Sequence, residues 1–341
     1  MSLFPRSRRA KFAPVAMALA FAISPAYAAD DTNEPVPGAR PAPVPWTGVP
    51  AEGGEGAVPL AVAVPTIFLD VSGVQSTISV PSTVTYHPGF DFYYASGTGS
   101  TNRPAFVFGS GGGAPTHVEE PLNIDARSWN FNANTGLLEV VTFNAAAGGA
   151  GRGLIEAQTD GGGLLDGGTA SLLATMPGNI GSQTAPAYDA GANVFFSRDN
   201  SNVVNRVSRA DGTLVSTLNL DFASAGITAA PDDGIVYVPE LAALGVLDEL
   251  ADTLSLFDLG GAYLATVSLP VDLTGNSRRP GYANGQLFVW DEALTGWQGL
   301  RIVDAVQPIQ AIPALSTLGF AALALLLAAL AVIGLRHRRA V

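Results

Sequence analysis

Histidine and acidic residues are the side chains from which a catalytic or metal site could be built in this chain. The sequence has three histidines, His87, His117 and His337, and no cysteine. The lack of cysteine excludes disulfides, thiolate zinc sites, cysteine nucleophiles and iron–sulfur clusters. His87 precedes Pro88-Gly89, His117 lies close to Glu119, and no nucleophile-elbow motif accompanies either histidine. We therefore predict structural or surface roles for both, with no Ser-His-acid triad and no transition-metal site.

The acidic residues offer oxygen ligands of the kind that calcium prefers. The candidate segments are Asp160-Gly161-Gly162-Gly163, Asp166-Gly167-Gly168, Asp199-Asn200 and Asp232-Asp233. None matches the EF-hand loop or the nonapeptide calcium repeat, and Asp-Gly is also a common hairpin turn. We predict turns here and no metal ligands, with calcium as the alternative. Pairs of acids that could hydrolyse glycosides are numerous, and no spacing selects one of them.

Glycine-rich and aromatic residues give no clearer chemistry. Gly109-Ser110-Gly111-Gly112-Gly113 lacks the following Lys and Ser/Thr of a phosphate-binding loop, so a flexible turn is predicted. Trp129, Trp290 and Trp297 are expected to pack between sheets and not to stack on sugars. The sequence therefore predicts no catalytic residue and no cofactor-binding residue.

Short strands are the elements that must position all of these residues. From Val62 onward, short apolar runs rich in β-branched and aromatic residues are bounded by Gly, Asn and Asp. The runs are Thr66–Leu69, Phe92–Tyr94, Ala105–Phe108, Leu138–Val141, Val194–Phe196, Ile235–Val238 and Gln286–Trp290. A turn or two of helix is expected within Glu240–Ala251.

A repeat emerges when the turns before these strands are aligned. The aligned units are His87-Pro88-Gly89-Phe90, Asn134-Thr135-Gly136-Leu137, Asp189-Ala190-Gly191-Ala192, Asp232-Asp233-Gly234-Ile235 and Ala283-Asn284-Gly285-Gln286. Further turns are expected at Asp211-Gly212 and at Leu259–Ala262. Units of about 45–50 residues with four strands are typical of β-propeller blades. We predict an all-β, propeller-like domain of five blades, or six if the first strands count, in which Thr66–Val80 could supply a closing strand. A pair of β-sandwiches is the alternative.

The first residues read as a secretory signal. A basic region from Arg6 to Lys11 precedes an apolar stretch, and Ala26-Tyr27-Ala28 is a small-x-small cleavage pattern. We expect signal peptidase to cleave after Ala28. Ser7-Arg8-Arg9 hints at the twin-arginine route, but the general secretory route is the preferred prediction. A proline-rich, extended spacer follows up to about Pro59.

Charge is distributed unevenly along the chain. Between the basic ends, 10 arginines stand against all 29 acidic residues, a net charge of −19. Such a field repels phosphate backbones, so the composition argues against nucleic-acid binding.

An apolar segment near the other end predicts a transmembrane helix. Leu315–Leu335 is 21 residues long without a charge. As a helix it would be roughly 32 Å long, enough to cross the hydrocarbon core. Arg336, Arg338 and Arg339 follow directly, and the positive-inside rule places them in the cytoplasm and the acidic domain outside.

The same region carries a resemblance to a known sorting signal. Ile312-Pro313-Ala314-Leu315-Ser316, followed by the apolar segment and the arginines, resembles the IPTL-CTERM signal of Gram-negative bacteria, of the class that includes PEP-CTERM. The resemblance covers roughly residues 311–341, and Ala314, Thr317 and Leu318 depart from the usual Thr, Glu and Trp. It implies recognition by an exosortase-type membrane transpeptidase, cleavage near Ile312-Pro313 and transfer to the cell surface or extracellular matrix. A permanent single-pass anchor is the alternative.

These observations divide the chain into six segments. They are a signal peptide (1–28), a linker (29–61), an exported propeller-like domain (62–304), a linker with the sorting motif (305–314), a transmembrane helix (315–335) and a basic cytoplasmic tail (336–341). The predicted function is a non-enzymatic binding, adhesion or structural module at the surface or in the matrix. A secreted propeller hydrolase or lactonase with a calcium site is the second hypothesis.

Overall fold

The computed structural model describes residues 61–306 of the chain, with short gaps. The gaps are residues 75–77, 79, 100–102, 120–123, 144–152, 167–170, 177–179, 181–183, 229–230, 232–233 and 274–278. The predicted signal peptide, the spacer up to residue 60 and the sorting tail from residue 307 lie outside the described residues. Within the described part, no helix has the length and apolar character needed to cross a membrane.

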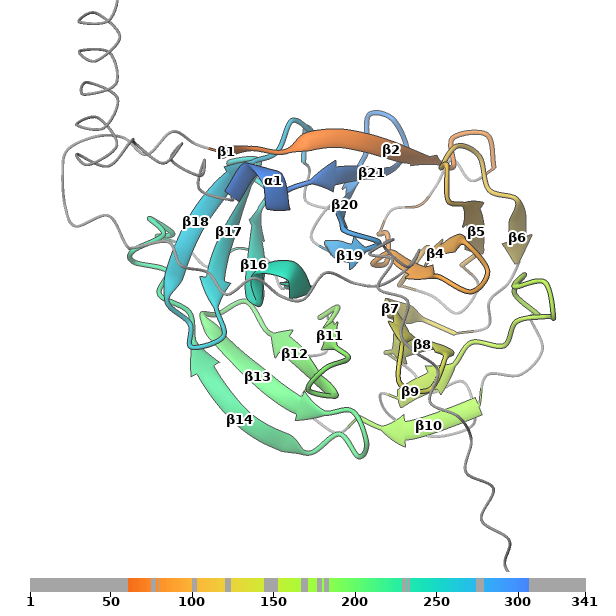
Figure 1. Cartoon of the computed structure of the whole chain (residues 1–341), viewed down its shortest axis with the longest axis horizontal. Coiled ribbons are helices and arrows are strands. Elements are labelled where there is room, and N and C mark those ends of the chain that lie inside the picture. Colours follow the sequence, from red (N-terminus) through yellow and green to blue (C-terminus); the bar gives the residue numbers. More distant parts are fainter. Residues whose placement is uncertain are drawn as a thin grey trace, which may run out of the picture. The chain divides into compact units, whose positions relative to one another are not determined.

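Five antiparallel sheets arranged in a ring make up the described domain (Figure 1). Blade 1 contains β3 (Thr85–His87), β4 (Phe92–Ser96), β5 (Ala105–Gly109) and β6 (His117–Glu119). Blade 2 contains β7 (Ala126–Asn132), β8 (Leu137–Thr142), β9 (Gly153–Glu156) and β10 (Ser171–Thr175). Blade 3 contains β11 (Ala187–Asp189), β12 (Val194–Arg198), β13 (Val203–Ser208) and β14 (Leu214–Asn219).

The last two blades also use the first strands of the described chain. Blade 4 contains β15 (Val236–Val238), β16 (Ala243–Asp248), β17 (Thr253–Asp258) and β18 (Tyr263–Ser268), with β1 (Ala61–Val62) added in parallel to β18. Blade 5 contains β19 (Gly281–Ala283), β20 (Gln286–Asp291), β21 (Gly296–Arg301) and, as its outer strand, β2 (Val64–Asp70). The chain is thus a five-bladed β-propeller, which confirms the preferred prediction and shows that the six-blade and β-sandwich alternatives were wrong.

The ring is closed by β2, which pairs antiparallel with β21 from Val64↔Arg301 to Asp70↔Gly296. A closing strand within Thr66–Val80 was predicted, and the strand found here starts earlier and ends at Asp70. Beyond it the chain turns, and the Asp70 carboxylate accepts a hydrogen bond from the Ser72 N–H at 2.9 Å. Residues more than 220 positions apart in the sequence therefore complete one sheet.

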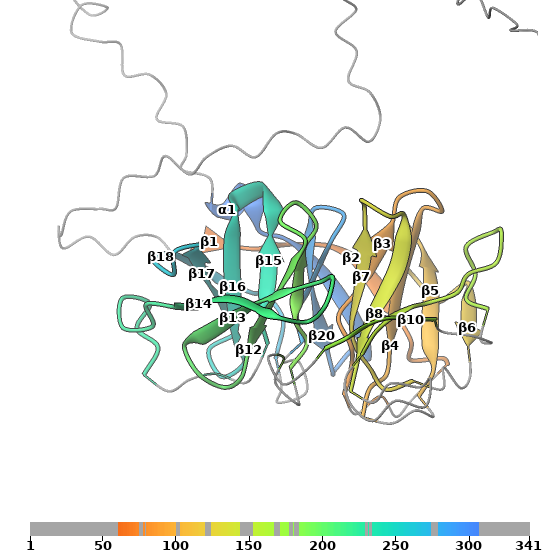
Figure 2. The same cartoon turned by 90° about the horizontal axis from the view of Figure 1, so that it is seen from below.

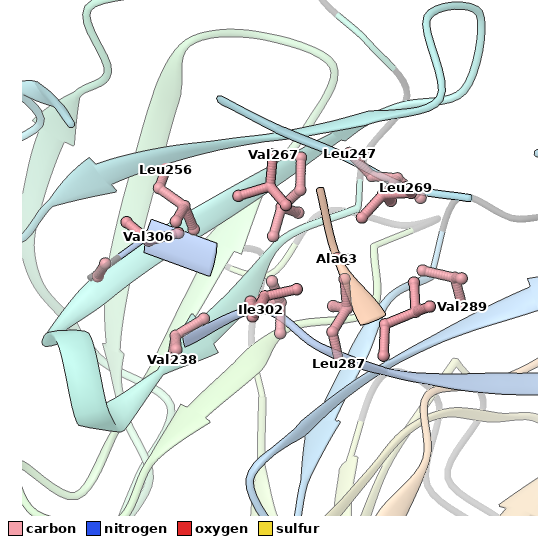
Figure 3. Close-up of a cluster of buried hydrophobic side chains, with 14 of the residues drawn as sticks. Ala63, Val238, Leu247, Leu256, Val267, Leu269, Leu287, Val289, Ile302 and Val306 are labelled. Carbon is pink, nitrogen blue, oxygen red and sulfur yellow. The ribbon is translucent and has the colours of Figure 1, made fainter. Parts of the chain in front are cut away.

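Apolar side chains fill the spaces between neighbouring blades. The largest of these clusters joins blades 4 and 5, and it also takes in Ala63, Ile302 and Val306 from the two ends of the described chain (Figure 3). Ile302 directly precedes the short helix α1 (Val303–Val306), and Val306 is its last residue. The helix extends two residues beyond Asp304, where the sequence analysis placed the end of the domain. A single blade cannot cover both of its own faces. Each of these clusters is therefore buried only when the blades on both sides of it are in place.

The predicted turns connect the first and second strands in four of the five blades. The exception is blade 4, where Gly234 lies before β15 and the turn is the 3₁₀-helix η1 (Pro239–Leu241), closed by Ala242 at φ 47°. The expected helix within Glu240–Ala251 is accordingly wrong beyond this single turn. Within that range, residues Ala243–Asp248 form the strand β16, which is largely buried and pairs with both β15 and β17. The turns at Asp211-Gly212 and Leu259–Ala262 join third to fourth strands, as predicted.

An aromatic residue repeats more regularly than the turn glycines. It stands one residue before the end of the innermost strand in every blade, at Tyr86, Phe131, Tyr188, Tyr237 and Tyr282. Each is partly buried, and the Tyr237 ring lies 5.6 Å from that of Phe196 in the preceding blade. These aromatic side chains help seal the junctions between innermost strands.

In blades 1 to 4, the connection between the third and fourth strands reaches back to the preceding blade. The contacts are the Gly113 N–H to the Phe68 carbonyl (2.7 Å), the Tyr94 hydroxyl to the Gly163 carbonyl (2.7 Å), the Arg209–Glu139 ion pair, and the Asp221 N–H to the Gly261 carbonyl (2.8 Å). Each turn therefore fixes the position of one blade against the next.

Gly281 in β19 lies directly against the backbone of blade 1. A Cβ atom at Gly281 would lie 2.6 Å from the Val84 nitrogen and 2.8 Å from its carbonyl oxygen. Both neighbours are backbone atoms, which cannot rotate away, so only glycine fits without moving one blade.

We predict that Gly281→Ala lowers the free energy of unfolding by about 1–3 kcal/mol, because the added methyl group forces the two inner strands apart. Gly109→Ala is the matched control, since nothing lies within 4 Å of the position that its new methyl group would take. It should change stability by less than about 0.5 kcal/mol. Chemical denaturation of both variants measures the difference, and equal stability would contradict the close approach.

Candidate functional site

The two histidines of the described domain do not come together. His87 ends β3, the innermost strand of blade 1, whereas His117 begins β6, the outermost strand of the same blade. The His117 imidazole lies 3.3 Å from the Glu119 carboxylate. The two histidines therefore belong to strands at opposite edges of the same four-stranded sheet.

His87 is held as a neutral ring within the blade 1–blade 2 junction. Its Nδ1 accepts a hydrogen bond from the Gly89 N–H at 3.2 Å, and its ring centroid lies 4.3 Å from Phe90 and 4.5 Å from Phe131. Burial lowers the pKa of His87 below its ordinary value, because the charged form loses solvation. The ring is thus a packing and turn-stabilising group.

The carboxylates of several turns are occupied by their own backbone. Asp160 Oδ1 accepts hydrogen bonds from the Gly162 and Leu164 N–H groups at 2.8 and 2.9 Å. Asp189, Asp248 and Asp258 each accept two backbone N–H groups in the same manner. This is the Asx-turn geometry by which Asp shapes tight turns, and it confirms the predicted turn at Asp160.

The other predicted acidic segments are only partly described. Asp166 and Asp199 are exposed in the structure, whereas residues 167–168 and 232–233 fall in the gaps. Among the described residues, no group of three or more His, Asp or Glu side chains is placed to hold a metal ion.

A charged junction between blades 2 and 3 was not anticipated from the sequence. Glu139 in β8 is fully buried, and Arg209 in the β13–β14 turn binds both of its carboxylate oxygens. Asn132 donates a further hydrogen bond to Glu139 at 2.9 Å. The hydrogen bonds that Arg209 donates to the Glu139 carboxylate raise the pKa of the Arg209 guanidinium.

Tyr188 belongs to the same junction. Burial, with the nearby Glu139 charge as a smaller cause, raises the pKa of Tyr188 to about 12. Its hydroxyl donates to Asn193 Oδ1 at 3.0 Å, and Asn134 donates to the Ala190 carbonyl at 2.8 Å. The junction can position polar groups, and the raised pKa values keep Tyr188 neutral and Arg209 charged near neutral pH.

A second polar cluster lies at the junction of blades 5 and 1. Asp91, held at φ 60°, accepts hydrogen bonds from the hydroxyls of Tyr86 and Ser110, and these bonds lower its pKa. Desolvation, with smaller contributions from Asp91, raises the pKa of Tyr86 to about 12. Asn284 and Gln286 donate to the Tyr93 hydroxyl at 3.0 and 3.2 Å. The cluster is a hydrogen-bonding surface whose ionisable groups titrate far from neutrality.

The glycine-rich segment at Gly109–Gly113 packs against the closing strand β2. A Cβ atom at Gly112 would lie 2.7 Å from the Phe68 carbonyl oxygen, and the Asp70 N–H donates to the Gly113 carbonyl at 2.9 Å. The predicted turn is present, and backbone hydrogen bonds hold it against the closing strand β2. Its glycines allow blade 1 to pack against β2.

The tryptophans pack inside, as predicted. All three belong to the buried clusters, and the rings of Trp290 and Trp297 meet edge to face at 4.9 Å. Trp129 Nε1 donates to Ser96 Oγ at 2.9 Å, and Trp297 Nε1 donates to the Ser82 carbonyl at 3.0 Å. Their faces are covered by neighbouring side chains and cannot serve as stacking platforms for a sugar.

The comparisons with known proteins do not assign this chain to a family. No protein-family model and no curated protein matches the chain. Among solved structures, glutaminyl cyclase of Myxococcus xanthus matches with a TM-score of 0.48 and 10% identity over 70% of this chain and 96% of its own. The calcium-binding protein regucalcin of Agrobacterium tumefaciens matches with a TM-score of 0.45 and 13% identity over 71% and 95%. The WD40 propeller domain of Doa1 matches with a TM-score of 0.37 and 11% identity over 64% and 78%. TM-scores this low support no conclusion about the activity of this chain.

The Arg209–Glu139 pair gives a direct test of the blade 2–blade 3 junction. Arg209→Ala should lower the free energy of unfolding by about 3 kcal/mol, because it leaves a buried carboxylate without its cation. The double variant Arg209→Ala/Glu139→Gln should lose less, since the buried charge is then gone as well. Urea denaturation of the single and double variants provides the comparison, and equal losses would contradict the ion pair.

The lowered pKa of His87 predicts a pH dependence of stability. The unfolded chain binds this proton more readily than the folded one, so the stabilisation is complete above about pH 6.5 and declines as the pH falls toward the folded-state pKa. His87→Gln should therefore flatten the loss of unfolding free energy below that pH. Parallel curves for the variant and the natural protein, measured by denaturation at several pH values, would refute it.

Proposed function

We propose that this chain is an exported cell-surface or extracellular-matrix protein whose propeller is a non-enzymatic binding or structural module. The observation that carries the proposal is the three-part tail. Ile312-Pro313, the uncharged Leu315–Leu335 segment and the arginines from Arg336 onward follow one another in the order of an exosortase-type sorting signal. The acidic domain would lie outside the inner membrane, and the tail would hold it there until a transpeptidase acts.

The chemistry of the described propeller supports a binding or structural role. Among the described residues of the five innermost strands, Asp189 is the sole acidic residue, and its Oδ1 already accepts two turn amides. A propeller hydrolase that works with paired carboxylates would instead need at least two acidic side chains to converge at one end of the channel. Tyr86, Tyr188 and His87 all have pKa values shifted toward their neutral forms, which suits hydrogen bonding.

The intact mass of the protein from its native cells tests the export and sorting proposal. We expect a mature chain that lacks residues 1–28 and everything after about Pro313. The variant Ile312→Ala/Pro313→Ala should keep its tail, and Pro308→Ala, outside the motif, should be processed like the natural chain. A natural chain that reaches the membrane with its apolar segment intact would contradict sorting. Cytosolic protein with both ends intact would contradict export as well.

A further inference from the structure

The outermost strand of blade 3, β14, carries exposed apolar side chains on the rim of the propeller. Among the described strands, it has a neighbour on one side only, which is β13. It lies on the rim of the ring in Figure 1 and on the side nearest to the viewer in Figure 2. Leu214 is 47% exposed and Val215 is 54% exposed. Such an edge pairs readily with another extended chain unless something covers it.

The equivalent strand of blade 4, β18, has a partner on this edge. Both strands are six residues long, and each has a β-bulge at its second residue, Val215 in β14 and Leu264 in β18. Beyond the bulge, β18 pairs in parallel with β1, and the Ala63 N–H donates to the Ser268 carbonyl at 2.9 Å. The fold therefore already adds an extended segment of the chain to one edge of this shape.

The hydrogen bonds of blade 3 show which backbone groups β14 offers on its outer side. The Leu220 N–H donates inward to the Asn202 carbonyl at 2.8 Å. Because successive residues of a strand direct their backbone groups to opposite sides, Leu218 faces β13, whereas Thr217 and Asn219 face outward. Both outward-facing residues are exposed. Thr217 is therefore at the centre of the edge that a further strand could use.

The proline-rich spacer before the propeller has the residue spacing of an edge strand. Its prolines between residues 34 and 46 stand at positions 35, 37, 41, 43 and 45, which are all odd. Proline is tolerated in a strand where its missing N–H faces away from the ladder. In an extended chain, residues 40–46 would therefore place every proline on one side and keep a complete set of N–H groups on the other. Those N–H groups belong to Arg40, Ala42, Val44 and Trp46.

The length of chain before β1 allows this segment to reach blade 3. β1 is parallel to β18, so its first residue, Ala61, is at the end that faces the β17–β18 turn. That turn touches the end of β14, because a Cβ atom at Gly261 would collide with the Asn219 carbonyl oxygen. Roughly 20 Å of β18 separates Gly261 from Val267, the partner of Ala61. The fourteen residues 47–60 can span at most about 50 Å, which is more than the distance requires.

We propose that residues 40–46 of the chain's own spacer pair in parallel with β14, as β1 does with β18. The even-numbered residues exchange hydrogen bonds with Thr217 and accept one from the Asn219 N–H. Parallel pairing ends the segment at the β17–β18 turn, from which the chain enters β1 without reversing its direction. The prolines then form the outer edge, which offers no N–H at these positions to another chain. Tethering favours this segment over the spacer of a second copy, and the inference does not depend on export or sorting.

Amide hydrogen exchange at single-residue resolution tests this pairing on the full chain held in neutral-lipid nanodiscs. The Thr217 and Asn219 amides face outward, so only a strand on the outer edge of β14 would slow their exchange. Ala42→Pro removes an N–H that the proposed ladder uses, and it should speed the exchange of both amides at least tenfold. The Leu218 amide, which faces β13, should stay protected in every variant and reports that the propeller remains folded.

The matched control is Ala39→Pro, the same chemical change at an odd-numbered position outside residues 40–46. It leaves the N–H groups of the proposed ladder in place, so it should change the exchange of the Thr217 amide less than twofold. Fast exchange of this amide in the natural chain, no effect of Ala42→Pro, or an equal effect of both variants would overturn the proposal. So would a dimer in sedimentation that Ala42→Pro disperses, because the spacer would then come from a second copy.

Discussion

The pairing of β2 with β21 is the interaction on which the rest of the structure depends. The apolar clusters lie between neighbouring blades, so a blade is stable only when both of its neighbours are in place. In a ring this requirement must also be met where the first blade meets the last. The Val64–Asp70 strand meets it by completing blade 5 and by receiving the Gly113 turn of blade 1. Closure thus converts five marginal sheets into one domain.

The same constraint determines where the polar chemistry can lie. Contacts between blades use the residues that might otherwise form a reactive site, such as Glu139 with Arg209 and Tyr93 with Asn284. The turn carboxylates are likewise occupied by backbone N–H groups, as at Asp160 and Asp258. The described surface still exposes several apolar side chains at turns, such as Leu250 and Leu294, which would be available to a partner in the binding role that we propose.

Local sequence patterns predicted most of the fold, but they did not predict the contacts between residues that are far apart in the sequence. Short β-branched runs and Asp/Asn-Gly turns predicted the strands and the number of blades, because both depend on neighbouring residues. The η1 turn of blade 4 was missed, since Gly234 lies on the wrong side of β15. Aligning the inner-strand aromatics, such as Tyr188 and Tyr237, would have found the correct frame. The Glu139–Arg209 pair joins residues 70 positions apart, and no local pattern marks it. The export and sorting segments lie outside the described residues and stay predictions.

A disulfide across the closing strand pair tests the central claim most directly. The chain has no cysteine, and Val64 and Arg301 are directly paired on β2 and β21, within the reach of a disulfide. The variant Val64→Cys/Arg301→Cys should oxidise within a single chain and gain about 5 kcal/mol of stability from the very long loop that it closes. Oxidation that yields only disulfide-linked dimers, or an intramolecular bond without any rise in the melting temperature, would contradict closure of the ring by this strand.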